Sequence, residues 1–286
     1  MTTSRVDDVF AKGRTAVVTG AANGIGAAAA RAFAARGLRV CCFDRDATAL
    51  ATSSTALRDG GADVVEVVGD ITDVAAVGRL VDVAGDDIAV LFNNAAIAAG
   101  GGPWAPVEDW RRQLETNLLS MVLTQSLVVP KLLAQAGPAV VVNLGSKQGI
   151  TTPPGNAAYN AAKAGVKVLT EQLAHELRQI AGDRVSAHLL VPGFTWTAMN
   201  GASSSSASSS AKPDEAWTPD QVVDFFFERV ARGDFYIVCP DNAVSSSLDR
   251  LRIRWALGDV VENRPALSRW HPDWKDRFAA FIAAGE

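Results

Sequence analysis

Short apolar runs rich in valine, leucine and isoleucine recur along the 286-residue chain, separated by alanine-rich stretches. Each run is apolar on both of its faces, which is typical of a strand covered from both sides. The segments between the runs are long enough for crossover helices, so the pattern predicts a parallel sheet with helices on both faces. We expect a doubly wound α/β fold whose seven strands span residues 15–19, 39–43, 64–68, 89–92, 139–144, 185–191 and 235–238.

One helix has a complete start signal in the sequence. Thr218 can act as the N-cap, Pro219 fits the first turn, and Gln221 can complete a capping box. Apolar residues follow at helical spacing from Val222 to Val230. We therefore predict a helix that begins after Thr218 and leads into the seventh strand.

Two segments depart from this alternation, although we expect a single domain over residues 1–286. Residues 198–217 are rich in serine and poor in large apolar groups, a composition that predicts a mobile loop. Residues 241–286 contain three tryptophans. This C-terminal extension has enough apolar surface to pack on the domain or on a neighbouring subunit.

The charge balance and the cysteines exclude several classes of protein. Lys and Arg number 27 against 31 Asp and Glu, so the chain has no overall basic field for nucleic acid. Three cysteines without metal spacing cannot form a disulfide framework, which fits a reducing compartment. Asp7 and Asp8 stand where a secretory peptide would be apolar, and no run of 18 apolar residues occurs. We expect a cytoplasmic protein with no membrane partner.

The first strand ends in a glycine-rich turn, TGAANGIG, which contains Gly20, Gly24 and Gly26. Such a turn lets backbone N–H groups and the positive end of the next helix approach a pyrophosphate. The spacing GxxxGxG departs from the common GxGxxG fingerprint, and a packing role is the alternative.

A carboxylate follows the second strand. Asp44 stands 24 residues after Gly20, where it can accept hydrogen bonds from both hydroxyls of an adenosine ribose. It would repel the 2'-phosphate of NADP, which favours NAD, although Arg45 could offset this by pairing with that phosphate. The alternative for Asp44 is the N-cap of a helix near Ala47, a role that Asp46 could fill equally well.

Tyr159 and Lys163 stand four residues apart in YNAAK, at the start of a long amphipathic helix. Their Cβ atoms should therefore lie about 5 to 6 Å apart on one helix face. One cation about 4 Å from a phenol supplies roughly the 4 kcal/mol needed to bring its pKa from about 10 to about 7. Ser146 follows the fifth strand, at the carboxyl edge where open α/β sheets bind ligands. Three polar groups are thus expected to converge beside a cofactor.

Six motifs in this order resemble the classical short-chain dehydrogenases and reductases, over residues 14 to about 240. The motifs are TGAANGIG, NNAA at Asn93, Asn117 in ETN, Ser146 in NLGS, YNAAK, and PGFTWT from Pro192. The resemblance implies a Rossmann-type sheet and the exchange of a proton between Tyr159 and the substrate oxygen. Lys163 would hold the nicotinamide ribose and lower the tyrosine pKa, Ser146 would bind the substrate oxygen, and Asn117 would keep a water in a proton relay.

The same resemblance implies two sets of binding residues. The NAD site would comprise Gly20, Asn23, Gly24, Ile25, Gly26, Asp44, Arg45, Asp70, Ile71, Asn93, Ala95, Tyr159, Lys163, Pro192, Gly193, Thr195 and Thr197. The substrate pocket would comprise Ser146, Gln148, Asn156, Trp196 and Met199, with Lys147 and residues 151–156 beside them. The alternative for Asp70 is a helix cap before Asp73, and for Asn93 a turn residue. Ala96 departs from the usual glycine of the NNAG motif.

Other enzyme classes fit less well. HELRQ lacks the second histidine of a zinc-protease helix, because Gln179 stands in its place, and we expect no metal. Ser146 is not in the GxSxG elbow of a hydrolase.

The sequence therefore predicts an NAD-dependent oxidoreductase that interconverts a secondary alcohol and a ketone of moderate bulk. An NADP-dependent ketoreductase and a non-catalytic dinucleotide-binding regulatory protein are the alternatives. The resemblance favours a homotetramer or homodimer built partly from the helices of Asn117 and Tyr159. The serine-rich loop would close as a lid over the substrate, or else serve as a connector.

Overall fold

The computed structural model describes residues 3–200 and 211–285. Seven strands form one parallel sheet in the order β3-β2-β1-β4-β5-β6-β7. The strands are β1 (Thr15–Thr19), β2 (Arg39–Asp44), β3 (Val64–Val68), β4 (Ile88–Asn93), β5 (Ala139–Leu144), β6 (Val185–Val191) and β7 (Tyr236–Val238). All seven predicted strands are confirmed, with ends that differ by at most one residue.

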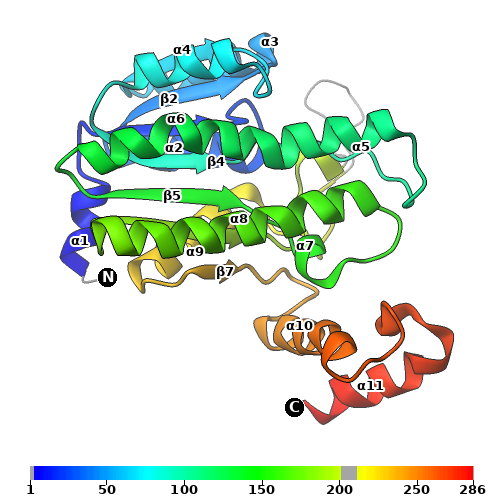
Figure 1. Ribbon diagram of the computed structural model, residues 1–286. Helices are drawn as coiled ribbons and strands as arrows, with labels where there is room; N and C mark the ends of the chain where they lie inside the picture. The colour runs from blue at the N-terminus through cyan, green and yellow to red at the C-terminus, as the bar shows by residue number, and fades with distance from the viewer. Residues whose placement is uncertain (1–2, 201–210, 286) are drawn as a thin grey trace.

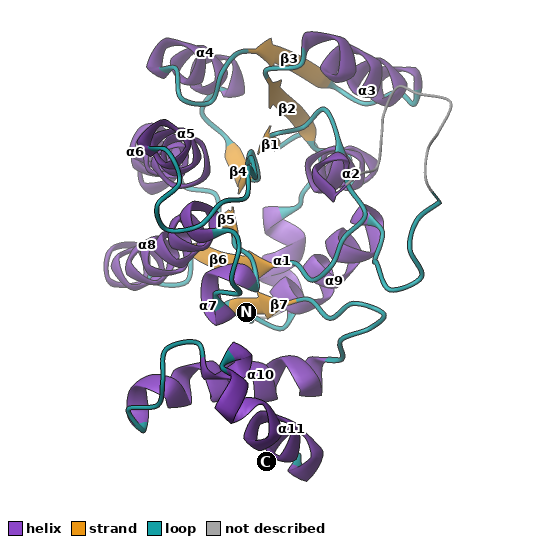
Figure 2. Cartoon of the chain, turned by 90° about the vertical axis from the view of Figure 1, so that its right-hand side faces the viewer, coloured by secondary structure: helices purple, strands orange, loops and turns teal. Residues whose placement is uncertain are grey.

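Helices cover both faces of the sheet, as Figures 1 and 2 show. One face carries α2 (Gly24–Ala35), α3 (Ala47–Asp59) and α9 (Pro219–Ala231), with α1 (Thr3–Val9) against α9. The other face carries α4 (Val74–Ala84), α6 (Ser120–Ala134) and α8 (Ala157–Ala181). The predicted doubly wound fold is therefore confirmed.

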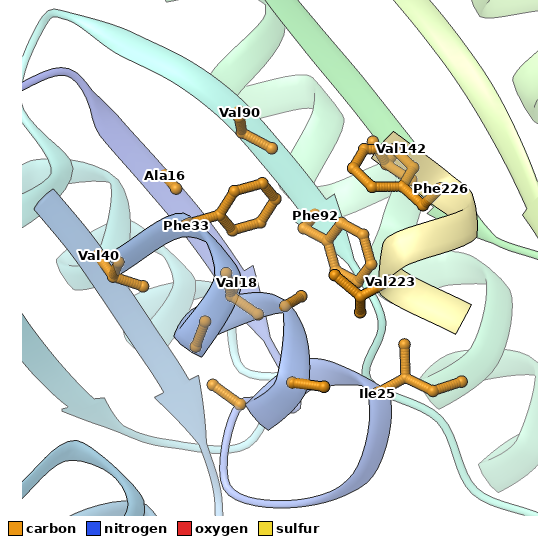
Figure 3. Close-up of a cluster of buried hydrophobic side chains, with 14 of the residues drawn as sticks. Ala16, Val18, Ile25, Phe33, Val40, Val90, Phe92, Val142, Val223 and Phe226 are labelled. Atoms are coloured by element: carbon orange, nitrogen blue, oxygen red, sulfur yellow. The ribbon is translucent and has the colours of Figure 1, made fainter. Parts of the chain in front are cut away.

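Aromatic rings fill the core beneath α2 and α9, as Figure 3 shows. Phe92 of β4 lies edge-on to Phe33 of α2 and to Phe226 of α9, with ring centroids 5.9 and 5.8 Å apart. The alanines at 27–30 keep α2 close to the sheet because they have no bulk beyond Cβ. The predicted capping box at Thr218 is present at the start of α9, with Gln221 as its partner.

A continuous helical stretch crosses the other face. It comprises α5 (Val107–Leu114), a π-helical turn η1 (Glu115–Leu119) and α6. By length and composition alone, residues 107–134 could cross a membrane. In this fold the stretch instead packs its apolar side against the sheet, with Val128 and Leu132 fully buried.

The C-terminal extension forms a helical unit beside the short helix α7 (Gln148–Thr151), as Figure 1 shows. It comprises α10 (Ser246–Val261), the 3-10 turns η3 (Ser268–Trp270) and η4 (Pro272–Trp274), and α11 (Lys275–Ala284). Trp255 of α10 holds the unit together, because Trp274, Phe278 and Phe281 pack around its ring.

Only part of the expected mobile loop lies within the described residues. Its first residues form the 3-10 turn η2 (Ala198–Asn200). At its other end, Trp217 donates a backbone hydrogen bond to Phe194 and accepts one from Trp196. The serines at 203–210 lie outside the described residues, so the lid remains a prediction.

The three cysteines are buried and unpaired. Burial raises the pKa of Cys41 to about 11 and that of Cys42 and Cys239 to about 12. These thiols are therefore protonated at neutral pH and act as small apolar groups in the core.

Candidate functional site

A cavity of about 510 Å³ opens at the carboxyl edge of the sheet. It lies where the strand order reverses between β1 and β4, the usual ligand position in doubly wound sheets. Most of the predicted site residues meet in it. They are Gly20, Asn23, Gly24, Ile25, Asp44, Ala95, Ser146, Gln148, Asn156, Tyr159, Lys163, Pro192, Gly193, Thr195, Thr197 and Met199.

The glycine turn after β1 leaves no room for side chains. Gly20 has a φ of 66°, and a Cβ on it would lie 2.7 Å from the Asn94 side chain and 2.9 Å from Ala95 Cα. Gly24, with a φ of 57°, begins α2, and the N-cap residue Asn23 makes no side-chain capping bond. The first N–H groups of α2 therefore remain available to an anion.

Asn94 holds this turn in place. Its amide nitrogen donates to the carbonyls of Thr19 and Gly20, both at 3.0 Å, and its backbone N–H donates to the Thr19 hydroxyl. Asn94 also lines the cavity, whereas its neighbour Asn93 does not. The NNAA motif led us to predict Asn93 at the cofactor site, whereas its neighbour Asn94 is the asparagine that lines the cavity.

Asp44 connects β2 to the glycine turn. Its carboxylate accepts hydrogen bonds from the backbone N–H groups of Ala22 and Asp46, both at 3.0 Å. The N-cap of α3 is Asp46, which accepts from Ala49, so Asp44 does not have the alternative capping role. Asp44 lines the cavity, and the exposed Arg45 beside it does not.

Tyr159 and Lys163 project from the first two turns of α8 toward the end of β5. A hydrogen bond joins the side chains of Tyr159 and Ser146, and the Ser146 hydroxyl also accepts from the backbone of Gln148 at 3.1 Å. Lys163 is 1% exposed, and its ammonium donates to the carbonyl of Leu144 at 2.7 Å. Its nitrogen lies 5.7 Å from the centroid of the Tyr159 ring. The structure thus brings the three predicted polar groups together.

The pKa of Tyr159 differs from our expectation. It is raised, because burial disfavours the phenolate more than the hydrogen bond from Ser146 stabilises it. Burial also lowers the pKa of Lys163 to about 7, so its ammonium is only partly populated at neutral pH. In this arrangement Lys163 does not bring the pKa of Tyr159 below its ordinary value, because both groups are buried and Lys163 is not a fixed cation. The role expected of Lys163 beside a bound cofactor remains a prediction.

Asn117 lies behind the cavity wall, within the π-helical turn η1. Its fully buried amide accepts from the backbone N–H of Ile97 at 2.8 Å and donates to the carbonyl of the same residue at 2.9 Å. It does not line the cavity. Asn117 therefore fixes the segment that follows β4, and the water that we expected it to hold remains a prediction.

Asn93 belongs to a buried network of polar side chains behind the cavity. Its amide donates to Asn143 at 2.9 Å and accepts from Thr124 at 2.8 Å. Asn143 also accepts from Gln125 and donates to Thr170. Asn93 thus joins β4 to β5. Contrary to our expectation, it does not line the cavity.

Other predicted residues also lie away from the cavity lining. Ile71 packs into the core beneath α4, and the Asp70 carboxylate accepts two hydrogen bonds from Thr72, which lower its pKa. Arg45, Gly26 and Trp196 do not line the cavity either. A Cβ on Gly26 would lie 2.0 Å from the Gly20 carbonyl, so this glycine allows the close packing of α2 on the turn.

Several lining residues were not predicted from the sequence. Besides Asn94, they are Ala96, Ala98, Leu144, Gly145, Phe194 and Ala198. Most stand next to predicted residues in the same motifs, and this adjacency is the signal that could have found them.

A charged cluster supports the floor of the cavity. Lys147, which lines it, forms ion pairs with Asp241 at 3.3 Å and with Asp249 of α10 at 2.6 Å. Asp241 also accepts from the backbone N–H of Phe194 at 3.0 Å. Burial raises the pKa of Asp249, and the hydrogen bond with Lys147 opposes this rise. The cluster therefore ties the C-terminal extension to two segments of the cavity wall, which no local sequence signal indicates.

Comparison with known proteins gives a consistent result. The family model described as short chain dehydrogenase matches residues 14–208. The 1-deoxy-11-beta-hydroxypentalenate dehydrogenase of Streptomyces exfoliatus is 34% identical over 253 residues, which cover 86% of this chain and 88% of that enzyme.

Solved structures with either cofactor resemble this fold. A short chain dehydrogenase/reductase from Burkholderia phymatum, solved in complex with NAD, has a TM-score of 0.76 at 30% identity. The match covers 88% of this chain and 96% of that one. A putative NAD(P) dependent gluconate 5-dehydrogenase from Beutenbergia cavernae, solved with bound NADP at low occupancy, has a TM-score of 0.62 at 32% identity. That match covers 68% of this chain and 77% of the other.

Proposed function

Because the chain belongs to the short chain dehydrogenase family, we propose that it is an NAD-dependent oxidoreductase that interconverts a secondary alcohol and a ketone. The observation that carries the proposal is the hydrogen-bonded pair of Tyr159 and Ser146, which lies in the same cavity as Lys163 and the glycine turn. A group that can donate or accept a proton, beside a glycine turn suited to a dinucleotide, supports this proposal.

The residues of this cavity fit a nicotinamide dinucleotide. Gly20 and Gly24 form a cradle that a Cβ would fill, and the uncapped start of α2 suits a pyrophosphate. Lys163 and Thr197 would hold the nicotinamide half. When bound, this cofactor supplies or accepts a hydride.

NAD is the cofactor that we favour over NADP. Asp44 lines the cavity at the end of β2, and its negative charge would repel a 2'-phosphate there. The exposed Arg45 lies outside the cavity lining, which reduces its ability to offset that repulsion.

Tyr159 would transfer the proton, and Ser146 would position the substrate oxygen. In ketone reduction the phenol donates its proton to the carbonyl oxygen, while the Ser146 hydroxyl donates a hydrogen bond to the same atom. The raised pKa of Tyr159 keeps this phenol protonated at neutral pH, as an acid catalyst requires. Alcohol oxidation is the reverse, in which the phenolate removes the hydroxyl proton.

The side chains around Ser146 favour an organic substrate of moderate bulk. Gln148 and Asn156 provide polar groups, whereas Phe194 and Met199 are apolar and partly exposed at the opening. This mixture suits a ring or branched carbon skeleton that carries one secondary alcohol.

We also propose that the protein acts in the cytoplasm as a homodimer or homotetramer. The unpaired, buried cysteines favour a reducing compartment. Leu119 and Val168, which are 54% and 55% exposed on η1 and α8, favour a subunit interface on this face.

The test is a screen of secondary alcohols of graded size with NAD, followed by the absorbance of NADH. The Tyr159→Phe variant should lose at least about a hundredfold in kcat, because it retains the ring but cannot transfer a proton. Its affinity for NAD should remain close to that of the unmodified protein.

Three outcomes would contradict parts of the proposal. Equal turnover by Tyr159→Phe would remove Tyr159 from the chemistry. Cofactor binding without turnover across a broad panel would favour the regulatory protein. Tighter binding of NADP than of NAD by the unmodified protein would favour the NADP-dependent ketoreductase, and Asp44→Ala should in any case shift the preference toward NADP.

A further inference from the structure

A second cavity of about 220 Å³ lies between the end of α7 and the C-terminal extension. It has no lining residue in common with the cavity around Tyr159. Ile150 and Thr151 of α7 form one wall, and Trp255 of α10 and Arg269 of η3 form part of the other. The proposed oxidoreductase function assigns no role to this cavity.

Two arginines line the second cavity without a carboxylate partner. Within residues 3–200 and 211–285, neither Arg252 nor Arg269 forms an ion pair or a hydrogen bond to an acidic side chain. The guanidinium of Arg269 instead lies over the rings of Trp270 and Phe278, at 4.8 and 5.2 Å. Burial and the charge of Arg252 lower the pKa of Arg269, whereas the charge of Asp249, which forms no ion pair with it, raises it.

The nearby carboxylates already have partners. Asp259, which lines the cavity, pairs with Arg264 at 3.3 Å and accepts two hydrogen bonds from Ser268. Asp249 pairs with Lys147 at 2.6 Å. Among the described residues, neither guanidinium group has a hydrogen bond to a carboxylate, although the negative charge of Asp249 acts on both from beyond ion-pair distance.

Buried donors in the same wall also lack acceptors. Trp255 is only 5% exposed, and its indole N–H has no hydrogen-bond partner in the described part of the chain. The same holds for the buried Nε of Arg252. A buried donor without an acceptor costs free energy, so an oxygen ligand at this position would stabilise the wall.

The remaining wall is apolar and open. Val260 is 84% exposed, and Leu257, Leu267 and Trp270 are also exposed along the lining. An occupant would thus meet cationic donors on one side and an apolar wall on the other.

We propose that this cavity binds a small organic carboxylate, whose charged end meets Arg252 and Arg269 and whose apolar body covers Val260 and Trp270. A carboxylate suits the two guanidinium groups because its two oxygens can accept from both. The bound molecule would touch the end of α7, the helix whose first residue, Gln148, lines the candidate active site.

The test uses hexanoate as the probe and hexanamide as its uncharged counterpart, measured by calorimetry with the full chain without cofactor. Hexanoate should bind more tightly than hexanamide to the unmodified protein. The R252Q/R269Q double variant should weaken hexanoate binding by about tenfold or more, because charge-assisted hydrogen bonds are lost. R250Q/R254Q is the matched control, since it also removes two positive charges, from exposed positions of α10 that do not line the cavity.

Two further measurements locate the bound probe. Hexanoate should protect backbone amides at residues 150–152 and 252–260 from hydrogen exchange. R252K/R269K, which keeps both charges, should retain part of the affinity for hexanoate. This variant tests the role of the charges even if R252Q/R269Q folds poorly.

The proposal is wrong if R252Q/R269Q, shown to be folded by circular dichroism, binds hexanoate as well as R250Q/R254Q does. It is also wrong if protection appears only at residues 144–148 and 192–199, which would place the probe in the candidate active site. If no binding occurs and sedimentation shows a dimer with residues 257–270 protected, the apolar wall is covered by a second copy of this chain.

Discussion

Lys163 is almost completely buried, and its ammonium donates a hydrogen bond to the carbonyl of Leu144. Its pKa of about 7 lies far below its ordinary 10.5, because burial disfavours the ammonium. Between these two pH values, the unfolded chain binds a proton that the folded chain lacks. The free energy of unfolding contributed by this side chain therefore rises with pH from about 7 to 10.5 and is least below pH 7.

The Lys163→Met variant tests this linkage. At pH 6 it should gain stability relative to the unmodified protein, and the difference should shrink as the pH rises toward 10, as followed by urea denaturation. Its kcat should fall by about a hundredfold, since the amine no longer binds the cofactor beside Tyr159. A stability difference that does not change with pH would contradict the lowered pKa.

The raised pKa of Tyr159 predicts different pH profiles for the two directions of the reaction. Alcohol oxidation needs the phenolate, so kcat/KM for oxidation should rise with pH through neutrality and into the alkaline range. Ketone reduction needs the phenol, so its rate should stay level near neutrality and fall only at alkaline pH. Initial rates with NAD and with NADH check both profiles, and an oxidation rate that peaks below neutrality would contradict the assignment.

Adjacent residues show where sequence analysis reached its limit. The NNAA motif indicates this region, yet Asn94 holds the glycine turn while Asn93 faces the buried network. Neighbouring side chains at a strand end point in opposite directions, so a shift of one residue exchanges their roles. Ile71 was also predicted to bind the cofactor, but its apolar side chain packs in the core.

Among the elements, α10 depends on ion pairs that bridge distant parts of the chain. Lys147 and Asp249 are about a hundred positions apart in sequence, and neither pattern nor propensity predicts their contact. In contrast, the strands and the α9 capping box could be predicted, because periodicity and caps are local properties.

The Asp249→Asn variant should loosen α10 from the cavity floor. Asp241 still pairs with Lys147, so we expect a loss of about 1 to 2 kcal/mol in the free energy of unfolding rather than the larger cost of an unpaired buried charge. KM for the substrate should rise, since Lys147 lines the cavity. Urea denaturation and steady-state kinetics measure both effects.

Asp273→Asn serves as the control for this variant. Asp273 lies in the same extension, and its largely exposed carboxylate is 4.0 Å from His271 Nδ1. Its replacement should leave stability and KM nearly unchanged. Equal losses in the two variants would contradict a specific role for Asp249.

For the whole molecule, the apolar positions on η1 and α8 predict assembly. Sedimentation should show a dimer or tetramer of the unmodified chain. Leu119→Glu should shift the equilibrium toward the monomer, because a buried unpaired carboxylate at an interface is costly. Ala283→Glu, on the exposed side of α11, is the control, and a monomer in the unmodified protein would overturn the assembly.

The fold was predictable as a whole because parallel strands buried on both faces leave an unambiguous apolar pattern. The wall residues of the cavity were less predictable. Phe194, which the sequence did not indicate, is held at the cavity by a hydrogen bond to Asp241, a residue that follows the last strand. Such contacts join residues that are distant in sequence, so no local pattern indicates them.

Asn93 and Asn143 are paired in register across β4 and β5, and the Asn93 amide nitrogen donates to the Asn143 amide oxygen, which also accepts from Gln125. Replacing Asn143 by an apolar residue would leave the amide nitrogens of Asn93 and Gln125 without their acceptor inside the protein, and exchanging both asparagines would still leave Gln125 without one. Over evolutionary time these two positions should therefore change only together with their polar neighbours. A lineage that had lost only one of them would have to recruit a new hydrogen-bonding neighbour at the centre of the sheet.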